Sequence, residues 1–185
     1  MDTALVVRAQ AGDEEAFTAL AYACGDRLRR VAFGILRDWS LADDATQQAM
    51  LSIWRKLPRL RDPACFDAWA YRILVRSCHE HAGRARTWLP SLDADPDHGP
   101  SSPDAMKSVY DRDELERGFR RLSVDQRAVV VLHHLVGLPL DEVARTLGIP
   151  LGTAHSRLDR AMSKLRLALR VEAHRPRREP QVVVR

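Results

Sequence analysis

A proline-rich stretch divides the sequence into two halves and limits what the chain can fold into. Between positions 89 and 111, glycine, serine and aspartate accompany four prolines: Pro90, Pro96, Pro100 and Pro103. This composition supports neither a helical nor a strand period, so we predict a flexible linker over residues 87–110. On both sides of it, apolar residues recur at the 3.6-residue period of helices. The sequence therefore predicts an all-α protein with two small helical domains.

The first domain is predicted over residues 1–86. Ser40 and Asp43 form a predicted capping pair at the start of its second helix. Pro58 ends that helix, because the residue before a proline disfavours helical geometry. The expected helices cover about 13–35, 40–57 and 64–86, with a loop at 59–63.

The second domain is predicted over residues 111–170. Ser123, with Gln126 three positions later, predicts a capping box for a helix that ends at Gly137. The other expected elements are a short helix near 115–122, helices at 140–147 and 151–170, and a disordered basic tail at 171–185.

Residues 140–158 have the pattern of a helix-turn-helix. Ala144 would let the two helices approach closely, and Gly148 can take the left-handed conformation of the turn. Gly152 and Thr153 would bring the N-terminus of the second helix against backbone phosphates, which its free N–H groups and dipole attract. An ordinary helical hairpin with a charged outer face is the alternative, but the complete pattern favours DNA binding.

The second helix of this motif would present one face to the major groove. The candidates for base contacts are His155, Ser156, Asp159 and Arg160, and those for phosphate contacts are Arg157 and Lys164.

The charge distribution along the chain agrees with DNA binding by this helix. Residues 151–185 carry nine basic against three acidic side chains, whereas residues 87–116 carry eight acidic against two basic ones. A basic end beside an acidic middle is typical of a chain whose one end meets nucleic acid.

The composition argues against a membrane or secreted protein. Hydrophobic residues make up 45% and charged residues 29% of the chain, which is a globular balance. No apolar run is long enough for membrane insertion, and the N-terminus lacks the pattern of a secretory signal. We therefore expect a cytoplasmic protein.

Neither metal binding nor catalysis is expected. The three cysteines are widely spaced, and the neighbours in Cys78-His79-Glu80-His81 point in different directions on a helix. The chain has no glycine-rich phosphate loop, no HExxH pattern and no nucleophile with a base partner. We therefore expect no metal, no cofactor and no catalytic residue.

Four segments resemble the extracytoplasmic-function (ECF) RNA polymerase sigma factors of the sigma-70 family. Residues 137–161 (GLPLDEVARTLGIPLGTAHSRLDRA) resemble the family's promoter −35-binding motif. Residues 44–57 (DATQQAMLSIWRKL) are similar to the family's helix that docks on the polymerase clamp. Residues 66–73 (FDAWAYRI) are similar to the start of the −10-reading helix, and residues 8–17 (RAQAGDEEAF) are similar to the family's N-terminal segment.

The resemblance implies a subunit that binds core RNA polymerase and directs it to promoter DNA, and that is no enzyme. The outer face of the polymerase-docking helix would carry the contacts with core: Asp44, Gln47, Gln48 and Arg55. Gln48 stands where relatives commonly carry glutamate. The resemblance also implies an anti-sigma factor as a further partner.

For the −10 element, the resemblance implies a pocket that captures an unstacked base. The residues at this pocket or along the adjoining DNA backbone would be Lys56, Leu60, Arg61, Arg72 and Arg76. Many relatives carry asparagine at the position of Arg76, so the preferred base should differ. Trp69 and Tyr71 are candidates for stacking, although the spacing of Trp69 with Phe66 and Ile73 gives it an inward face.

Two other functions stay open at the level of sequence. A helix-turn-helix regulator that binds DNA without polymerase would leave residues 1–86 unexplained. A sigma mimic that sequesters an anti-sigma protein would keep the surface and lose the DNA contacts, whereas Arg157 and Arg160 are retained here. The acidic linker either mimics nucleic acid in the basic polymerase cleft or is a solubilising spacer.

Overall fold

The structure is a computed structural model that describes residues 1–88 and 115–173. Its regular elements within these two ranges are helices, which confirms the predicted all-α fold. The predicted linker and basic tail lie outside the described residues, except where helix α4 continues to Trp88 and helix α8 to Ala173. None of the described helices combines the length and hydrophobicity that spanning a membrane requires.

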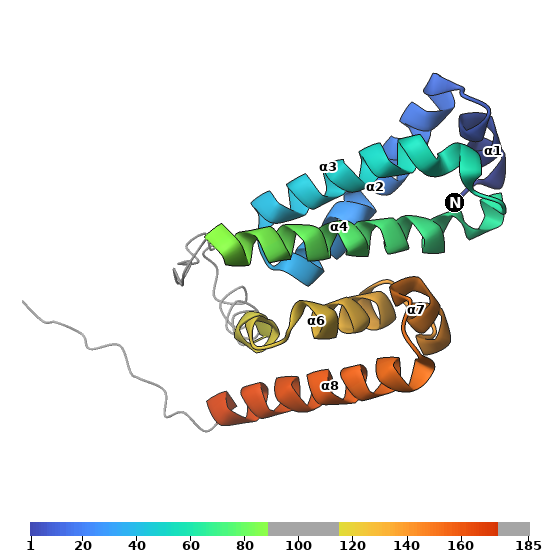
Figure 1. Ribbon diagram of the computed structural model, residues 1–185. Coiled ribbons are helices and arrows are strands. Elements are labelled where there is room, and N and C mark those ends of the chain that lie inside the picture. The colour runs from blue at the N-terminus through green and yellow to red at the C-terminus, as the bar shows by residue number, and fades with distance from the viewer. Residues whose placement is uncertain (89–114, 174–185) are drawn as a thin grey trace, which may run out of the picture.

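Four helices make up the first half (Figure 1): α1 (Thr3–Gln10), α2 (Glu14–Leu36), α3 (Trp39–Lys56) and α4 (Phe66–Trp88). Each of the three long helices turns an apolar stripe inward, and Leu28, Ile53 and Leu74 are completely buried there. Two short 3-10 turns, Leu57–Arg59 and Pro63–Cys65, connect α3 to α4.

The start of α3 corrects one prediction. Ser40 and Asp43 do not form its cap; instead the carboxylate of Asp38 accepts the backbone N–H three residues later. Arg37 ends α2 in the left-handed conformation with φ of 60°, so the connection between the helices is short and places Asp38 at the N-cap. Asp43 forms an ion pair with Arg29 on α2.

The second half contains helical residues 115–120, α6 (Val124–Val130), α7 (Leu140–Leu147) and α8 (Leu151–Ala173). The predicted capping box is confirmed. The Ser123 hydroxyl accepts the N–H of Gln126 (3.2 Å), and the Gln126 side chain accepts the N–H of Ser123 (3.1 Å). The single helix predicted up to Gly137 changes after α6 into a π-helical turn at Val131–Leu135, and Gly137 then takes a φ of 84°.

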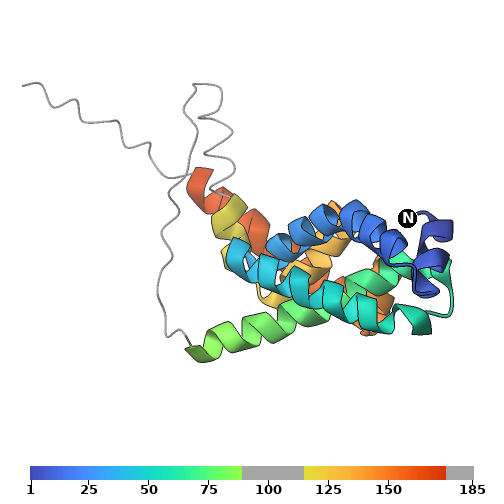
Figure 2. The ribbon, with the colours of Figure 1, turned by 90° about the horizontal axis from the view of Figure 1, so that it is seen from above.

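The two halves pack against each other and share one apolar core (Figures 1 and 2). Gly34 of α2 lies close to the second half, because a Cβ at this position would lie 2.8 Å from a methyl group of Val131. The guanidinium of Arg127 donates to the last carbonyl of α2 (3.4 Å), and Arg37 pairs with Glu116. Nothing in the sequence pattern predicted this contact between the halves.

Candidate nucleic-acid interface

The predicted helix-turn-helix is formed by α7 and α8. Gly148 ends α7 with a left-handed φ of 67°, as predicted. Ala144 of α7 and Ala154 of α8 are buried, as the close packing of the two helices requires. In the first turn of α8, the N–H of Thr153 donates to the carbonyl of Pro150 (2.9 Å). The N–H of Thr153 is therefore already occupied, which leaves the earlier N–H groups for a phosphate.

The candidates for base contacts share the outer side of α8. His155, Asp159 and Arg160 are exposed, and Ser156 is half-buried, while Gly152, a candidate for the approach to backbone phosphates, is also exposed. Their spacing of three and four residues places these side chains on one helical face. This face therefore presents imidazole, hydroxyl, carboxylate and guanidinium groups together to an approaching major groove.

The two phosphate candidates lie on the side of α8 that faces α6. The Arg157 guanidinium is 3.3 Å from the carboxylate of Asp125, and the Lys164 ammonium donates to the side chain of Gln126 (3.0 Å). Both partners belong to the first turn of α6. In this arrangement these two cations are engaged within the protein.

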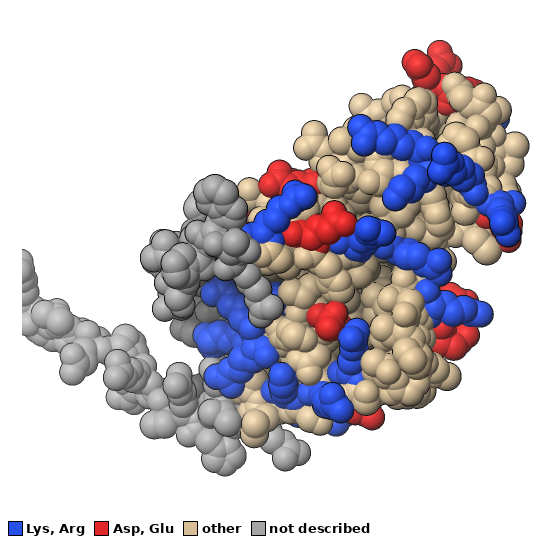
Figure 3. Space-filling model, viewed as in Figure 1, with Lys and Arg blue, Asp and Glu red and all other residues tan. Residues whose placement is uncertain are grey.

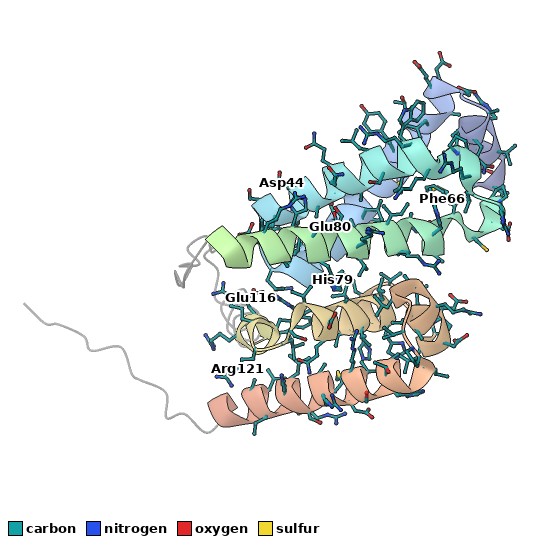
Figure 4. The ribbon with its side chains drawn as sticks, viewed as in Figure 1. Asp44, Phe66, His79, Glu80, Glu116 and Arg121 are labelled. Carbon is teal, nitrogen blue, oxygen red and sulfur yellow. The ribbon has the colours of Figure 1, made fainter. Side chains whose placement is uncertain are left out.

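The outer face of α3 is exposed at all four polymerase-contact candidates, which are Asp44, Gln47, Gln48 and Arg55. Figure 4 labels Asp44 near the N-terminal end of this helix. The sequence analysis missed two apolar neighbours on the same side. Leu51 is 46% exposed and Trp54 is 38% exposed. They follow Gln47 by four and seven residues, a spacing that could have indicated a second apolar stripe beside the buried one.

Leu51 and Trp54 belong to a shallow groove between α2 and α3. Its volume is about 380 Å³, and its walls are Glu14, Phe17, Thr18, Gln47, Met50, Leu51 and Trp54. The rings of Phe17 and Trp54 meet edge to face with their centroids 4.5 Å apart. An apolar groove bordered by exposed polar groups suits a protein partner.

A small pocket between α3 and α4 brings together two of the −10 candidates, Lys56 and Arg76. Its volume is about 230 Å³, and it is lined by Gln48, Ser52, Lys56, Ile73, Arg76, Ser77 and Glu80. Arg76 donates to the carboxylate of Glu80 one turn further along α4 (3.1 Å). The hydroxyl of Ser77, a residue only 4% exposed, makes no hydrogen bond within the described part of the chain. The pocket thus offers both donors and acceptors to a small polar ring.

The other −10 candidates lie elsewhere. Leu60 and Arg61 belong to the connection between α3 and α4, and neither lines the pocket. Tyr71 is only 2% exposed and lies in the core, so it is not available for stacking. Trp69 packs against the same core, in agreement with the inward face predicted for it.

A wider groove separates α4 from the second half, and DNA-contact candidates of both halves line it. Its volume is about 530 Å³, and its walls include Arg72, Arg76, Asp125 and Arg157. Arg72 donates to the carbonyl of Arg145 on α7 (2.8 Å). Figure 3 shows Lys and Arg side chains over both halves of this face with acidic groups between them.

Asp125 joins the two walls of the groove. One carboxylate oxygen lies 3.3 Å from Nη2 of Arg157, and the other lies 3.3 Å from Nε2 of His79 without the alignment of a hydrogen bond. Figure 4 shows His79 on the side of α4 that faces the second half. A single carboxylate therefore lies between α4 and α8.

The cysteines are distributed between core and surface. Burial raises the pKa of the Cys24 thiol to about 11 and that of the Cys78 thiol to about 12, because the thiolate would lose its hydration. Cys65 is exposed. Within residues 1–88 and 115–173, no three cysteine, histidine or carboxylate side chains gather as a metal site would need.

Comparison with known proteins agrees with this arrangement. The sequence matches the sigma-70 region 2 family over residues 20–88 and the sigma-70 region 4 family over residues 112–165. These two matches, in this order, define a sigma-70-type initiation factor.

Individual relatives narrow the class. The ECF RNA polymerase sigma factor SigM of Mycobacterium tuberculosis is 34% identical over 166 residues, which are 89% of this chain and 82% of the relative. The RNA polymerase sigma-H factor of Pseudomonas aeruginosa is 27% identical over 180 residues, covering 91% and 93%. The sigma factor RpoE from Bartonella quintana, solved in complex with the anti-sigma factor NepR, has a TM-score of 0.64 at 22% identity and covers 84% of this chain and 98% of its own.

This chain belongs to the ECF sigma factors. Members of this family are non-enzymatic initiation factors that bind core RNA polymerase and direct it to promoter DNA. The resemblance stated from the sequence is thereby confirmed.

Proposed function

We propose that three separate surfaces carry out promoter-directed initiation by this protein. The outer face of α3, with Asp44, Gln47, Gln48 and Arg55, binds core polymerase together with the adjoining apolar groove. The pocket between α3 and α4, with the connection that carries Leu60 and Arg61, captures an unstacked −10 base. The exposed face of α8 reads the −35 element, and Arg157 and Lys164 hold phosphates.

The observation that carries this proposal is the position of the α3–α4 pocket. Gln48 belongs both to the polymerase-contact face and to the wall of the pocket, so core polymerase and the captured base would meet at one helix. Basic groups at Lys56 and Arg76 suit the backbone of the opened strand. The chain contributes binding alone, and the polymerase performs the chemistry, in the cytoplasm.

Promoter binding also requires the two halves to separate. The −10 and −35 elements lie about 25 base pairs apart, or roughly 85 Å along B-form DNA. Arg72 and Arg157 line one groove in this structure, so both cannot reach their elements at once. We therefore assign residues 1–86 and 111–170 to two domains that act separately on DNA, residues 87–110 to the connection that lets them part, and residues 171–185 to a tail outside both.

An anti-sigma factor is the further partner that we propose. The structure of Bartonella quintana RpoE contains such a protein. The apolar groove of Leu51 and Trp54 is a surface of this chain that an anti-sigma helix would share with core polymerase, and competition between the two would silence the sigma factor.

The test is transcription from sheared genomic DNA with purified core polymerase. The wild-type chain should produce new start sites that share a bipartite upstream motif. Asp44→Ala with Gln47→Ala should abolish co-elution with core, whereas Lys56→Ala with Arg76→Ala should keep co-elution and lose the starts. Arg30→Ala, an exposed arginine on α2, is the matched control and should behave as wild type.

Two outcomes would contradict the proposal. Binding to core without new starts would favour a sequestering mimic. Binding to DNA without any affinity for core would favour a helix-turn-helix regulator and would remove the role of the α3 face.

A further inference from the structure

The last residue of α1 connects this helix to the segment that borders the −10 pocket. The side-chain amide nitrogen of Gln10 donates to the carbonyl of Leu57 (3.1 Å) and to the carbonyl of Leu60 (2.7 Å). These two carbonyls bracket the 3-10 turn that ends α3, and the N–H of Leu60 also donates to the Leu57 carbonyl (3.0 Å). One half-buried amide group therefore donates hydrogen bonds to the carbonyls at both ends of the turn.

The Leu60 carbonyl gains most from this donor, because the Leu57 carbonyl already accepts the N–H of Leu60. The last carbonyls of a helix have no N–H partner within that helix. Leaving such a carbonyl unpaired in a half-buried place costs free energy. Gln10 reaches across 47 and 50 residues to supply the donors.

The helix that carries Gln10 is itself firmly held. Val6 and Ala9 of α1 are buried in the core. Asp2 caps the helix start, and Arg8 pairs with Asp13 across the turn that leads to α2 (2.6 Å). Position 10 is thus a fixed point relative to the core, and a turn attached to it is fixed as well.

Candidate −10 contacts lie on both sides of the turn that Gln10 holds. Lys56, which lines the α3–α4 pocket, comes directly before it, and Leu60 and Arg61 form its far end. Gln10 itself lines neither that pocket nor the groove between the halves.

We propose that Gln10 is a positioning residue for −10 recognition, which holds the Leu57–Leu60 turn so that Lys56 keeps its place at the α3–α4 pocket and Leu60 and Arg61 keep theirs in the connection beside it. The inference rests on the proposed −10 role of this pocket. It predicts that loss of the two hydrogen bonds loosens base discrimination at −10 and leaves −35 recognition and core binding intact, because those surfaces lie on α8 and on the outer face of α3.

The experiment uses the full chain with core polymerase and three promoter templates. One template is the best wild-type promoter, the second differs at the −10 base with the strongest wild-type preference, and the third differs in the −35 element. Gln10→Glu keeps the shape but turns a carboxylate toward both carbonyls. Gln10→Lys restores a donor that can reach them. Val7→Ala is the matched control, since Val7 is an exposed residue of the same helix.

The expected result is a fall of about tenfold in the ratio of transcripts from the first and second templates with Gln10→Glu, the order of effect for one or two lost hydrogen bonds. Gln10→Lys and Val7→Ala should keep the wild-type ratio. The ratio for the −35 template and co-elution with core should be unchanged in all variants.

Several outcomes would overturn the inference. Unchanged −10 discrimination in Gln10→Glu would do so, as would equal losses at −10, −35 and core, which would indicate a structural role only. Should Gln10→Glu fail to fold, Gln10→Ala, which removes the donors without repulsion, replaces it under the same criteria. A wild-type chain that shows no −10 preference at all would instead contradict the proposed function.

Discussion

The two DNA-reading regions of this protein are built in different ways. The −35 candidates, Gly152 to Lys164, all lie on α8, and a single turn with Gly148 orients that helix. The −10 candidates come from α3, from the connection after it and from α4, and the connection also depends on Gln10 of α1. The −35 region is thus local in sequence, whereas the −10 region exists only when four separate segments pack together.

This difference indicates which kinds of substitution should affect each region. A single helical face keeps its shape as long as the helix forms, so changes there should act through individual contacts. A pocket assembled from several elements responds to changes in packing at a distance. In the groove between the halves, Asp125 faces His79 of the first half and Arg157 of the second half.

Near neutral pH, the largest effect is expected from crowding the contact between the halves. Gly34→Ala should destabilise the packed arrangement relative to Gly25→Ala on the same helix by about 1–3 kcal/mol, because only the first Cβ meets a neighbour, Val131. Chemical denaturation and small-angle scattering should show lower stability and a larger radius of gyration for Gly34→Ala. Equal behaviour of the two variants would mean that the halves do not hold together through this contact.

An effect of similar size but more selective is expected at the recognition face. Arg160→Ala should weaken binding to the −35 element by roughly 1–3 kcal/mol, about ten- to a hundredfold, while −10 discrimination stays as in wild type. Arg166→Ala, another exposed arginine of α8, should cause a lesser loss without change in sequence preference. Competition binding to −35 duplexes measures both, and a loss of −10 discrimination in Arg160→Ala would contradict the separation of the two regions.

Alkaline pH should destabilise the first half, which contains all three cysteines. Burial holds the pKa of the Cys78 thiol at about 12, above its ordinary value near 9, so this group favours the folded state below pH 9. The unfolded thiol ionises first as the pH rises, so Cys78 by itself should lower stability by about 1.4 kcal/mol per pH unit between pH 9 and 12, and Cys24 should add a similar slope up to about pH 11. Urea denaturation at several pH values should give a flatter profile for Cys78→Ala than for wild type.

The smallest effect is expected at Asp125, whose carboxylate lies in the groove between α4 and the second half. Asp125→Asn removes the charge that faces Arg157 and His79, and a half-exposed pair of this kind contributes about 0–1 kcal/mol. The variant should bind −35 duplexes up to a few times more tightly, because Arg157 becomes available for a phosphate. The difference should shrink at high salt, and weaker binding by Asp125→Asn would contradict the competition between carboxylate and DNA.

Much of the fold followed from local patterns. Helical periodicity predicted the long helices, the capping box of Ser123 and Gln126 was confirmed, and so was the left-handed Gly148. The cap of α3 was predicted wrongly, because the left-handed turn at Arg37 that moves the cap to Asp38 leaves no distinctive residue pattern. A non-glycine residue in that conformation is uncommon, so sequence rules favour other positions.

The sequence by itself determined the helices, the recognition motif and the resemblance to a sigma factor, because each depends on residues close together in the chain. Only the tertiary structure decided that Lys56 and Arg76 share a pocket, that Tyr71 is buried, that Gln10 clamps the turn after α3, and that both DNA-reading regions face one groove. Those features arise from contacts between residues far apart in the chain. Such contacts form only when apolar faces such as those of Gly34 and Val131 meet, and no local spacing records which faces will meet.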